Sequence, residues 1–511
     1  MLLHALARLA GAQPEFPLVE DGDLRLSAAE FSAAVDRFAA ALAQADVGPG
    51  ERVALLSRNS AAFLVAFLGT IRTGAILVPL NTRLAPAEWE FMINDSTATV
   101  LLASDDFIPA LDRLPLPGVR LRHGLGSAGT WPRLSAPDGA TPPPPPTDPE
   151  DDALQLYTSG TTGHPKGAVL SHRALSYLTV ALLAAGFRTQ DRVLVVLPLF
   201  HIFGVALIAL GVGAGSTLCL MDEFNPASAV RALSEGGITA TAMVPAMIQA
   251  CVFRVPQVGE LAYPSLRLVV YGGSPIAEPT LRAAAAAWRC GFTQAYGMTE
   301  IAPITLLDAA DHAKALTSEP ALLRSAGRIV PGLEMQVLGP DESPVPPGTT
   351  GEVVARGPLL MNGYWRREAA TAESTRGGWM HTGDAGYIDD RGYLFLQDRF
   401  KDLIVSGGEN IYPAEIERAI ASHPAVSEVA VIGVPDSRWG EAVRALVVLR
   451  EGATLTAMEV MAYCQANLAG FKRPRAVDFL DQLPRNATGK VLRWQLREPF
   501  WRGHHRRIAG S

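Results

Sequence analysis

Two kinds of hydrophobic pattern alternate through the first 300 residues. Short runs of β-branched and aliphatic residues are separated by longer Ala- and Leu-rich stretches with helical spacing. Apolar strands that alternate with helices are typical of parallel sheets covered by helices on both faces. The pattern predicts helices at 61–72 and 86–92, and strands at 52–56, 76–79, 99–103, 153–157, 192–198, 216–220, 239–244, 266–271 and 292–296.

The pattern changes after about residue 327. Glycine- and proline-rich turns separate short strands at 334–338, 351–356 and 393–396, which predicts a small β-barrel-like subdomain. From residue 398 a compact α+β unit is expected, with strands at 403–405, 429–434, 442–449 and 476–479 and helices at 414–422 and 457–466. We therefore expect an α/β fold. A large N-terminal domain, 1–397, holds two parallel-type sheet subdomains and the barrel-like subdomain, and a small mobile α+β domain, 398–511, follows.

Two further segments have an unusual composition. The stretch 193–221 contains no charged side chain and is long enough to span a bilayer. Pro198, His201 and four glycines interrupt it, so we expect a strand, a loop, a buried helix and a strand, and no transmembrane segment. Five successive prolines at 142–146 predict a stiff surface connector between the two sheet subdomains.

Charge and cysteine content limit the partners. A formal net charge of −7 argues against nucleic acid. The tail 491–511, with five arginines and one glutamate, leaves a peripheral membrane contact open. The four cysteines are scattered, with neither metal nor disulfide spacing, which fits a reducing, cytoplasmic compartment. A homodimer also stays open.

The segment YTSGTTGHPKGA at 157–168 carries the first candidate chemistry. Its glycines let backbone N–H groups approach an anion, its hydroxyls add donors, and Lys166 adds a compact positive charge. It is not a Walker A loop, because Gly160 is followed five positions later by Pro165. The composition indicates a polyphosphate site, whereas a plain flexible loop is the alternative.

Further motifs follow in order. They are PLFH at 198–201, YGGSP at 271–275, YGMTE at 296–300, HTGD at 381–384, DRFKD at 398–402 and NATGK at 486–490. With the 157–168 segment, they resemble the adenylate-forming superfamily of acyl-CoA synthetases, luciferases and peptide-synthetase adenylation domains. The resemblance covers nearly the whole chain and is strongest for the acyl-CoA synthetase type.

In YGMTE, the ring of Tyr296 can stack on adenine, Thr299 can donate to phosphate and Glu300 is a hard oxygen ligand suited to Mg²⁺. His201 would line the acyl site, although a core histidine is the alternative. The resemblance implies that Lys490 reaches the carboxylate and the α-phosphate, and that Lys401 lies at a hinge. It places at the nucleotide Thr158, Ser159, Gly160, Thr161, Thr162, Lys166, Gly272, Gly273, Ser274, Gly297, Met298, Asp384 and Arg399.

A second face is expected to serve thiol transfer. Gly407 and Gly408 would let a pantetheine arm lie against bare backbone, and Phe471, Arg473 and Arg475 would meet the adenine and phosphates of CoA. A plain basic surface patch is the alternative. In the family, rotation of the small domain alternates these two faces at one active site.

We therefore expect an ATP-dependent acid–thiol ligase with ATP, Mg²⁺ and CoA. It would convert an apolar carboxylic acid, fatty or aryl, to an acyl-AMP and pass the acyl group to CoA. Amino-acid-activating relatives carry an Asp just after the PLFH position, and this chain does not. One alternative loads a carrier protein, which would be separate because only 21 residues follow Lys490. Another is a catalytically inactive nucleotide-binding protein.

Overall fold

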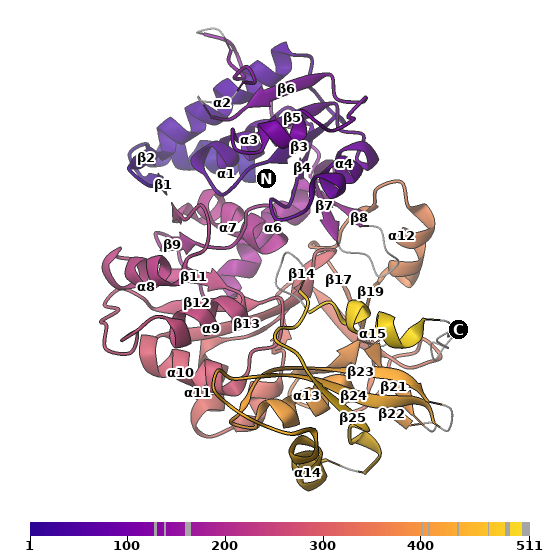
Figure 1. Ribbon diagram of the computed structural model, residues 1–511. Helices are drawn as coiled ribbons and strands as arrows, with labels where there is room; N and C mark the ends of the chain where they lie inside the picture. The colour runs from indigo at the N-terminus through magenta and orange to yellow at the C-terminus, as the bar shows by residue number, and fades with distance from the viewer. Residues whose placement is uncertain are drawn as a thin grey trace. The chain divides into compact units, whose positions relative to one another are not determined.

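The computed structural model describes residues 1–126, 130–136, 139–158, 165–399, 402–406, 409–436, 439–468, 470–485 and 491–502. The chain divides into two compact units (Figure 1). The first unit comprises Met1–Met335 and Ala355–His381, and the second comprises Gln336–Val354 and Thr382–Ser511. The division into a large and a small unit agrees with the expected α/β fold class, while the domain boundary at 398 stays a prediction.

A nine-stranded sheet forms one half of the first unit. Its order is β15 (Arg328–Ile329), β14 (Ile301–Leu307), β13 (Gly291–Met298), β12 (Leu268–Gly272), β11 (Ala240–Met243), β9 (Arg192–Val195), β10 (Thr217–Leu220), β1 (Pro17–Asp21) and β2 (Leu24–Ser27). The strands from β13 to β1 pair in parallel, whereas β2, β14 and β15 are antiparallel additions at the edges. In Figure 1 the helices α8 (Pro226–Glu235), α9 (Pro245–Arg254) and α10 (Glu278–Trp288) lie beside this sheet.

The other half contains a seven-stranded sheet. Its order is β18 (Gly363–Tyr364), β8 (Lys166–Ser171), β7 (Asp152–Thr158), β4 (Ile76–Pro79), β3 (Arg52–Leu56), β5 (Val100–Ala103) and β6 (Leu121–Gly124). Five of these strands pair in parallel, of which β3, β4, β5 and β7 were predicted and β6 was not, whereas β8 and β18 run antiparallel. The sequence pattern predicted neither of them, and each pairs antiparallel with its neighbour, β8 with β7 and β18 with β8.

Helices cover both faces of this sheet. On one face α3 (Ala61–Arg72) contributes Phe63 and Phe67 to the main core, and on the other α4 (Pro86–Asp95) contributes Trp89 and Met92 to a separate cluster. The remaining helices of the first unit are α1 (Leu2–Ala12), α2 (Ala28–Gln44), α5 (Ile108–Leu111), α6 (His172–Ala184), α7 (Ile202–Leu210), α11 (Ala309–Thr317) and α12 (Glu368–Ser374).

The uncharged stretch 193–221 folds as the sequence indicates. It forms β9, a loop, the buried helix α7, a π-helical turn at Gly211–Gly215 and β10. Among the residues described, no helix has both the length and the hydropathy to cross a bilayer. The strand stops at Val195, three residues earlier than predicted, because residues 197 and 199 bond to a side chain from elsewhere in the fold, described below.

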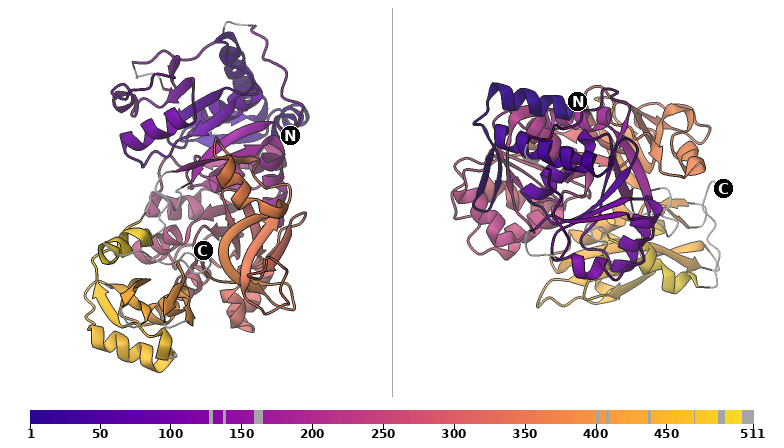
Figure 2. Two further views of the ribbon diagram at one scale, coloured as in Figure 1. Left: turned by 90° about the vertical axis from the view of Figure 1, so that its right-hand side faces the viewer. Right: turned by 90° about the horizontal axis from the view of Figure 1, so that it is seen from above.

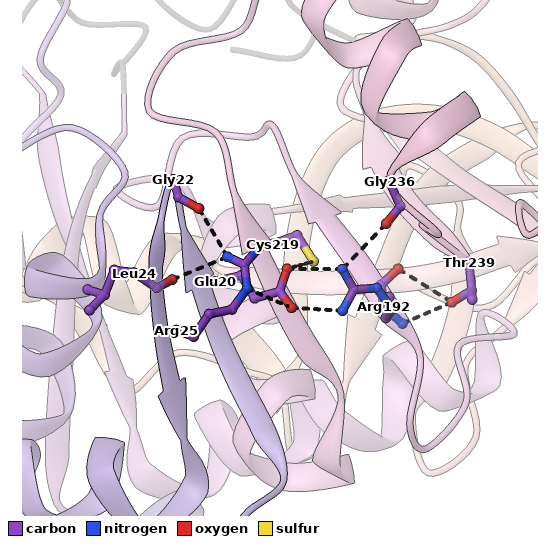
Figure 3. Close-up of polar contacts among 8 residues, drawn as sticks. All are labelled: Glu20, Gly22, Leu24, Arg25, Arg192, Cys219, Gly236 and Thr239. Carbon is purple, nitrogen blue, oxygen red and sulfur yellow. Dashed lines mark hydrogen bonds and ion pairs between the residues drawn. The ribbon is translucent and has the colours of Figure 1, made fainter.

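The N-terminal hairpin β1–β2 was not predicted. A polar network attaches it to the nine-stranded sheet (Figure 3). Arg192 at the start of β9 donates two hydrogen bonds to the carboxylate of Glu20 on β1, at 2.8 and 2.9 Å. Arg25 on β2 lies 3.5 Å from the same carboxylate, and the Cys219 thiol lies 3.6 Å from it. These contacts join the hairpin to strands that follow about 170 residues later in the chain.

Two further sheets consist mainly of residues from the second unit. The first is a four-stranded sheet of order β16 (Glu334–Leu338), β17 (Gly351–Arg356), β19 (Met380–Ile388) and β20 (Leu394–Arg399). Its strands β16, β17 and β20 match those predicted for the barrel-like subdomain, whereas β19 was not predicted. A second sheet has the order β22 (Glu409–Ile411), β21 (Ile404–Ser406), β24 (Gly440–Leu449) and β23 (Val426–Asp436), and β25 (Ala476–Phe479) also pairs with β24.

Helices lie on opposite faces of this second sheet (Figure 2). On one face α13 (Pro413–Ala421) and α14 (Ala457–Asn467) bury Ile416 and Val460 against alternate residues of β24. On the other face α15 (Arg493–Trp501) packs Leu496 against Leu446. The period of two along β24 therefore supplies both cores, as predicted for a small α+β unit.

Candidate active site

Three predicted motifs lie at the carboxyl ends of neighbouring parallel strands. His201 follows β9, the GGS segment at 272–274 ends β12, and the YGMTE segment at 296–300 ends β13. Because β9, β11, β12 and β13 are adjacent and parallel, these ends share one edge of the sheet. Ligands of open α/β sheets bind at this edge. The fold thus brings together segments that span 100 residues of sequence.

His201 caps the helix α7. Its Nδ1 accepts the backbone N–H of Phe203 at 3.3 Å. A ring nitrogen that accepts a hydrogen bond carries no proton, so the neutral imidazole holds its proton on Nε2. Burial lowers the pKa of His201 to about 4. The residue is therefore a neutral hydrogen-bond donor through Nε2 near pH 7, suited to a carboxylate oxygen.

Asn59, just after β3, holds the loop that precedes His201. Its side-chain nitrogen donates to the carbonyls of Leu197 and Met221 at 2.9 and 3.1 Å, and its oxygen accepts the N–H of Leu199 at 2.9 Å. Asn59 is buried, with 5% of its surface exposed. Sequence reasoning missed this residue, because no motif surrounds it and its partners lie about 140 residues away.

The GGS segment requires its glycines. A Cβ on Gly272 would lie 2.4 Å from the carbonyl oxygen of Ala295 on the neighbouring strand. Gly273 has φ of +84°, which side chains of L-residues rarely adopt, and it is exposed together with Ser274. The turn therefore presents accessible backbone at the end of β12.

The YGMTE segment forms a tight turn between β13 and β14. Tyr296 on β13 is half-buried, and Met298 and Thr299 are similarly accessible. A Cβ on Gly297 would lie 2.9 Å from the carbonyl oxygen of Ile301, so the turn needs glycine there. The turn leaves Tyr296 and Thr299 accessible to a ligand while Glu300 is buried.

Glu300 is the candidate metal ligand, and Tyr364 contacts it. The Tyr364 hydroxyl donates to Oε1 of Glu300 at 2.6 Å. Burial, followed by the neighbouring carboxylate, raises the pKa of Tyr364, so the hydroxyl remains protonated. Within the described residues no cluster of three or more His, Cys, Asp or Glu side chains could hold a metal. One carboxylate fits Mg²⁺ that takes its other ligands from phosphates and water.

The two ends of the predicted phosphate-binding segment lie on β7 and β8, which pair antiparallel. Thr158 pairs with Lys166, and the Thr158 hydroxyl lies 3.4 Å from the Lys166 carbonyl oxygen. The Lys166 ammonium lies 5.1 Å from the centre of the Tyr364 ring. Tyr364 therefore contacts both Lys166 and Glu300, which come from different motifs and different sheets.

The second unit carries the remaining described candidates. Asp384 on β19 stands directly opposite Arg399 on β20 in the antiparallel register. Arg473 donates to the carbonyls of Leu468 and Gln465 at 3.0 and 3.3 Å, so its charge supports the end of α14. Arg475 is exposed and lies 5.8 Å from the ring of Trp439, an accessible aromatic residue that sequence reasoning missed.

Several predicted site residues lie outside the described part of the chain. They are Ser159, Gly160, Thr161, Thr162, Lys401, Gly407, Gly408 and Lys490. The side chains of Arg399 and Phe471 are likewise outside the description. The roles of all these residues stay predictions.

Comparison with known proteins defines the class. Residues 6–365 match the family model of AMP-binding enzymes, and residues 415–490 match that of the AMP-binding enzyme C-terminal domain. The chain belongs to the AMP-binding enzyme family. This confirms the resemblance to the adenylate-forming superfamily and its acyl-CoA synthetase type.

Individual relatives cover nearly the whole chain. A fatty acid–acyl-carrier-protein ligase, ScoC, from Streptomyces coeruleorubidus is 38% identical over 93% of this chain and 91% of its own length. A feruloyl-CoA synthase from an Amycolatopsis species is 39% identical over 96% of this chain and 98% of its own. The structure of O-succinylbenzoate coenzyme A synthetase from Bacillus subtilis with ATP and magnesium gives a TM-score of 0.84 at 32% identity, over 96% of this chain and 98% of that one.

Proposed function

We propose that the protein joins an apolar carboxylic acid to CoA in two ATP-dependent steps. In the first step a carboxylate oxygen attacks the α-phosphorus of ATP, and the bond from this phosphorus to the bridging oxygen breaks. Acyl-AMP and pyrophosphate are formed. In the second step the sulfur of CoA attacks the acyl carbon, AMP leaves and the thiol proton passes to solvent.

The observation that carries this proposal is the shared sheet edge. At this edge, His201, a neutral donor, follows β9, the exposed turn at Gly273 follows β12, and Thr299 and Glu300 follow β13. His201 would donate through Nε2 to the carboxylate and hold it for attack. Thr299 and Lys166 would bind phosphate oxygens. Positioned donors and cations of this kind stabilise the charge that develops at phosphorus.

Mg²⁺ would be held by Glu300 and the phosphates, and when bound it neutralises charge on the departing pyrophosphate. Asp384 would accept hydrogen bonds from the ribose hydroxyls, with Arg399 opposite it. Lys490 would approach the carboxylate and α-phosphate in the first step only. Lys401 would be the hinge that exchanges this face for the thiol-transfer face.

For the thiol step we propose that Arg475 and Trp439 bind CoA, together with Gly407, Gly408 and Phe471. The exposed guanidinium beside an accessible indole suits the phosphates and adenine of CoA. Arg473 would act mainly through the end of α14. Transfer to a carrier protein is the second candidate, and the similarity to a carrier-protein ligase favours it.

The test is acid-dependent exchange of labelled pyrophosphate into ATP, with a panel of medium- and long-chain fatty acids and aromatic acids. We expect exchange with an apolar acid, and AMP release that depends on CoA. Faster AMP release with a phosphopantetheinylated carrier protein would favour the second candidate. ATP binding without exchange for any acid would refute the proposal and favour an inactive nucleotide-binding protein.

The proposal also covers the cellular compartment and the assembly of the protein. All four cysteines are free, and three of them are buried. We expect a cytoplasmic protein, with a peripheral membrane contact through the basic tail and a homodimer as further arrangements to be tested by fractionation and light scattering.

A further inference from the structure

Tyr364 connects the two sheets of the first unit. It belongs to β18, the edge strand of the seven-stranded sheet, whereas Glu300 lies in the turn between β13 and β14 of the nine-stranded sheet. The 2.6 Å hydrogen bond between them joins residues 64 positions apart. The backbone supports the same contact, because the N–H of Met361 donates to the Glu300 carbonyl at 2.9 Å.

The backbone around Tyr364 is fixed against the phosphate-binding hairpin. The N–H groups of Asn362 and Trp365 donate to the carbonyls of Val169 and Gly167 on β8, each at 2.8 Å. The Tyr364 N–H donates to the Thr371 hydroxyl at 2.9 Å. The tyrosine therefore keeps a constant register with the strand that begins at Lys166.

Asp95, at the end of α4, hydrogen-bonds both to β7 and to the chain that follows Tyr364. Its carboxylate accepts the hydroxyl of Tyr157, the residue before Thr158, at 2.8 Å and a guanidinium hydrogen of Arg367 at 2.7 Å. The backbone carbonyl of Asp95 accepts the indole N–H of Trp365 at 3.1 Å. Asp95 therefore holds in place both the strand that leads into the 157–168 segment and the residues just after Tyr364.

The ring of Tyr364 lies near a positive charge, and its hydroxyl binds a negative one. Its ring face lies 5.1 Å from the Lys166 ammonium, within the range of a cation–π contact. Its hydroxyl occupies Oε1 of Glu300, and within the described residues Oε2 accepts no hydrogen bond. Hydrogen bonds to a ligating carboxylate orient its other oxygen toward the metal.

We propose that Tyr364 is a positioning residue for the ATP half-reaction, holding the Glu300 carboxylate and the Lys166 ammonium in a fixed relation across the two sheets. This inference rests on the proposed function. Tyr364 touches neither reacting group. It would set the distance between the metal-binding oxygen and the phosphate-binding cation, so its loss should affect metal–nucleotide binding and the first step more than thiol transfer.

The first test replaces Tyr364 by phenylalanine, which keeps the ring and removes the hydroxyl. Binding of Mn²⁺ in the presence of a non-hydrolysable ATP analogue is followed by electron paramagnetic resonance, independently of turnover. We expect affinity for Mn²⁺ to fall about 10- to 100-fold, as for other residues that orient a metal ligand. Tyr364→Leu also removes the ring, and affinity for the nucleotide should fall by a further factor of about 2 to 5.

A matched control is Tyr263→Phe. That hydroxyl donates to the Val258 carbonyl at 2.8 Å, and neither residue belongs to the predicted site, so Mn²⁺ affinity and exchange should be unchanged. The Glu300→Gln variant completes a double-mutant cycle. If Tyr364 acts through Glu300, removing its hydroxyl should have little further effect on Mn²⁺ binding in the Glu300→Gln background.

Measuring the thiol-transfer step distinguishes a positioning role of Tyr364 from a purely structural one. CoA acylation from supplied acyl-AMP should remain within about twofold of the parent protein in Tyr364→Phe, whereas pyrophosphate exchange falls with the metal affinity. Unchanged Mn²⁺ binding, additive effects in the cycle, or equal loss of both half-reactions would overturn the inference. If the parent protein supports no exchange with any acid, the proposed function fails, independently of Tyr364.

Discussion

Replacing Asn59 by alanine tests whether a buried amide far from any motif controls the acyl site. The substitution removes three hydrogen bonds, to Leu197, Leu199 and Met221, at 2.9 to 3.1 Å. Each such bond contributes about 0.5–1.5 kcal/mol net, and a buried backbone group left without a partner costs about 1–3 kcal/mol. Because Asn59 is 5% exposed, water does not readily replace the amide. We expect the free energy of unfolding to fall by about 3 kcal/mol.

The functional consequence follows from the position of the loop. Residues 197–199 lead directly to His201, so a relaxed loop moves the donor that would orient the carboxylate. A displacement of about 1 Å in a group that positions the substrate can cost about 100-fold in rate. Pyrophosphate exchange should therefore fall, with the Michaelis constant for ATP nearly unchanged.

Urea unfolding monitored by tryptophan fluorescence and by circular dichroism measures the stability, and coincidence of the two curves checks that one transition is being followed. Asn94→Ala is the matched control, because Asn94 is exposed and makes one side-chain bond, at 3.3 Å. It should cost less than about 0.5 kcal/mol. Parent-like stability and exchange in Asn59→Ala would refute the reasoning.

Three further predictions concern charged and titrating groups. Lys490→Ala should reduce acyl-AMP formation by about 10²- to 10³-fold while CoA acylation from supplied acyl-AMP persists, and equal loss of both steps would contradict the two-face mechanism. The hydrogen bond from Arg192 holds the pKa of Glu20 below its usual 4.5, so this group stabilises the fold above that pH and the contribution is lost as pH falls through the depressed value. Glu20→Gln should flatten the dependence of the urea midpoint on pH below about 5, and an unchanged slope would contradict the pairing seen in Figure 3. Because burial lowers the pKa of His201 to about 4, His201→Asn should reduce the exchange rate by a constant factor between about pH 5 and pH 9, and a rate ratio that changes near pH 6.5 would show that the imidazole titrates there.

Much of the fold follows from local pattern. The strands β3 and β4 and the helix α3 have the predicted bounds, because continuous apolar runs leave few alternatives for their burial. The edge strands were harder. β18 has two residues and β2 has none buried, so neither carries the periodicity that marks a strand. Each exists through pairing with a distant partner.

The amino-acid sequence by itself determined which chemical groups the candidate site contains, because the glycines, hydroxyls and charges of ordered motifs indicate their chemistry before the fold is known. Tertiary structure alone decided which groups hold them in place. Asn59 and Tyr364 stand in no motif read from the sequence, and their partners lie 138 and 64 residues away. A hydrogen bond depends on a separation in space of about 3 Å, and only the packing of the two sheets brings such distant residues that close.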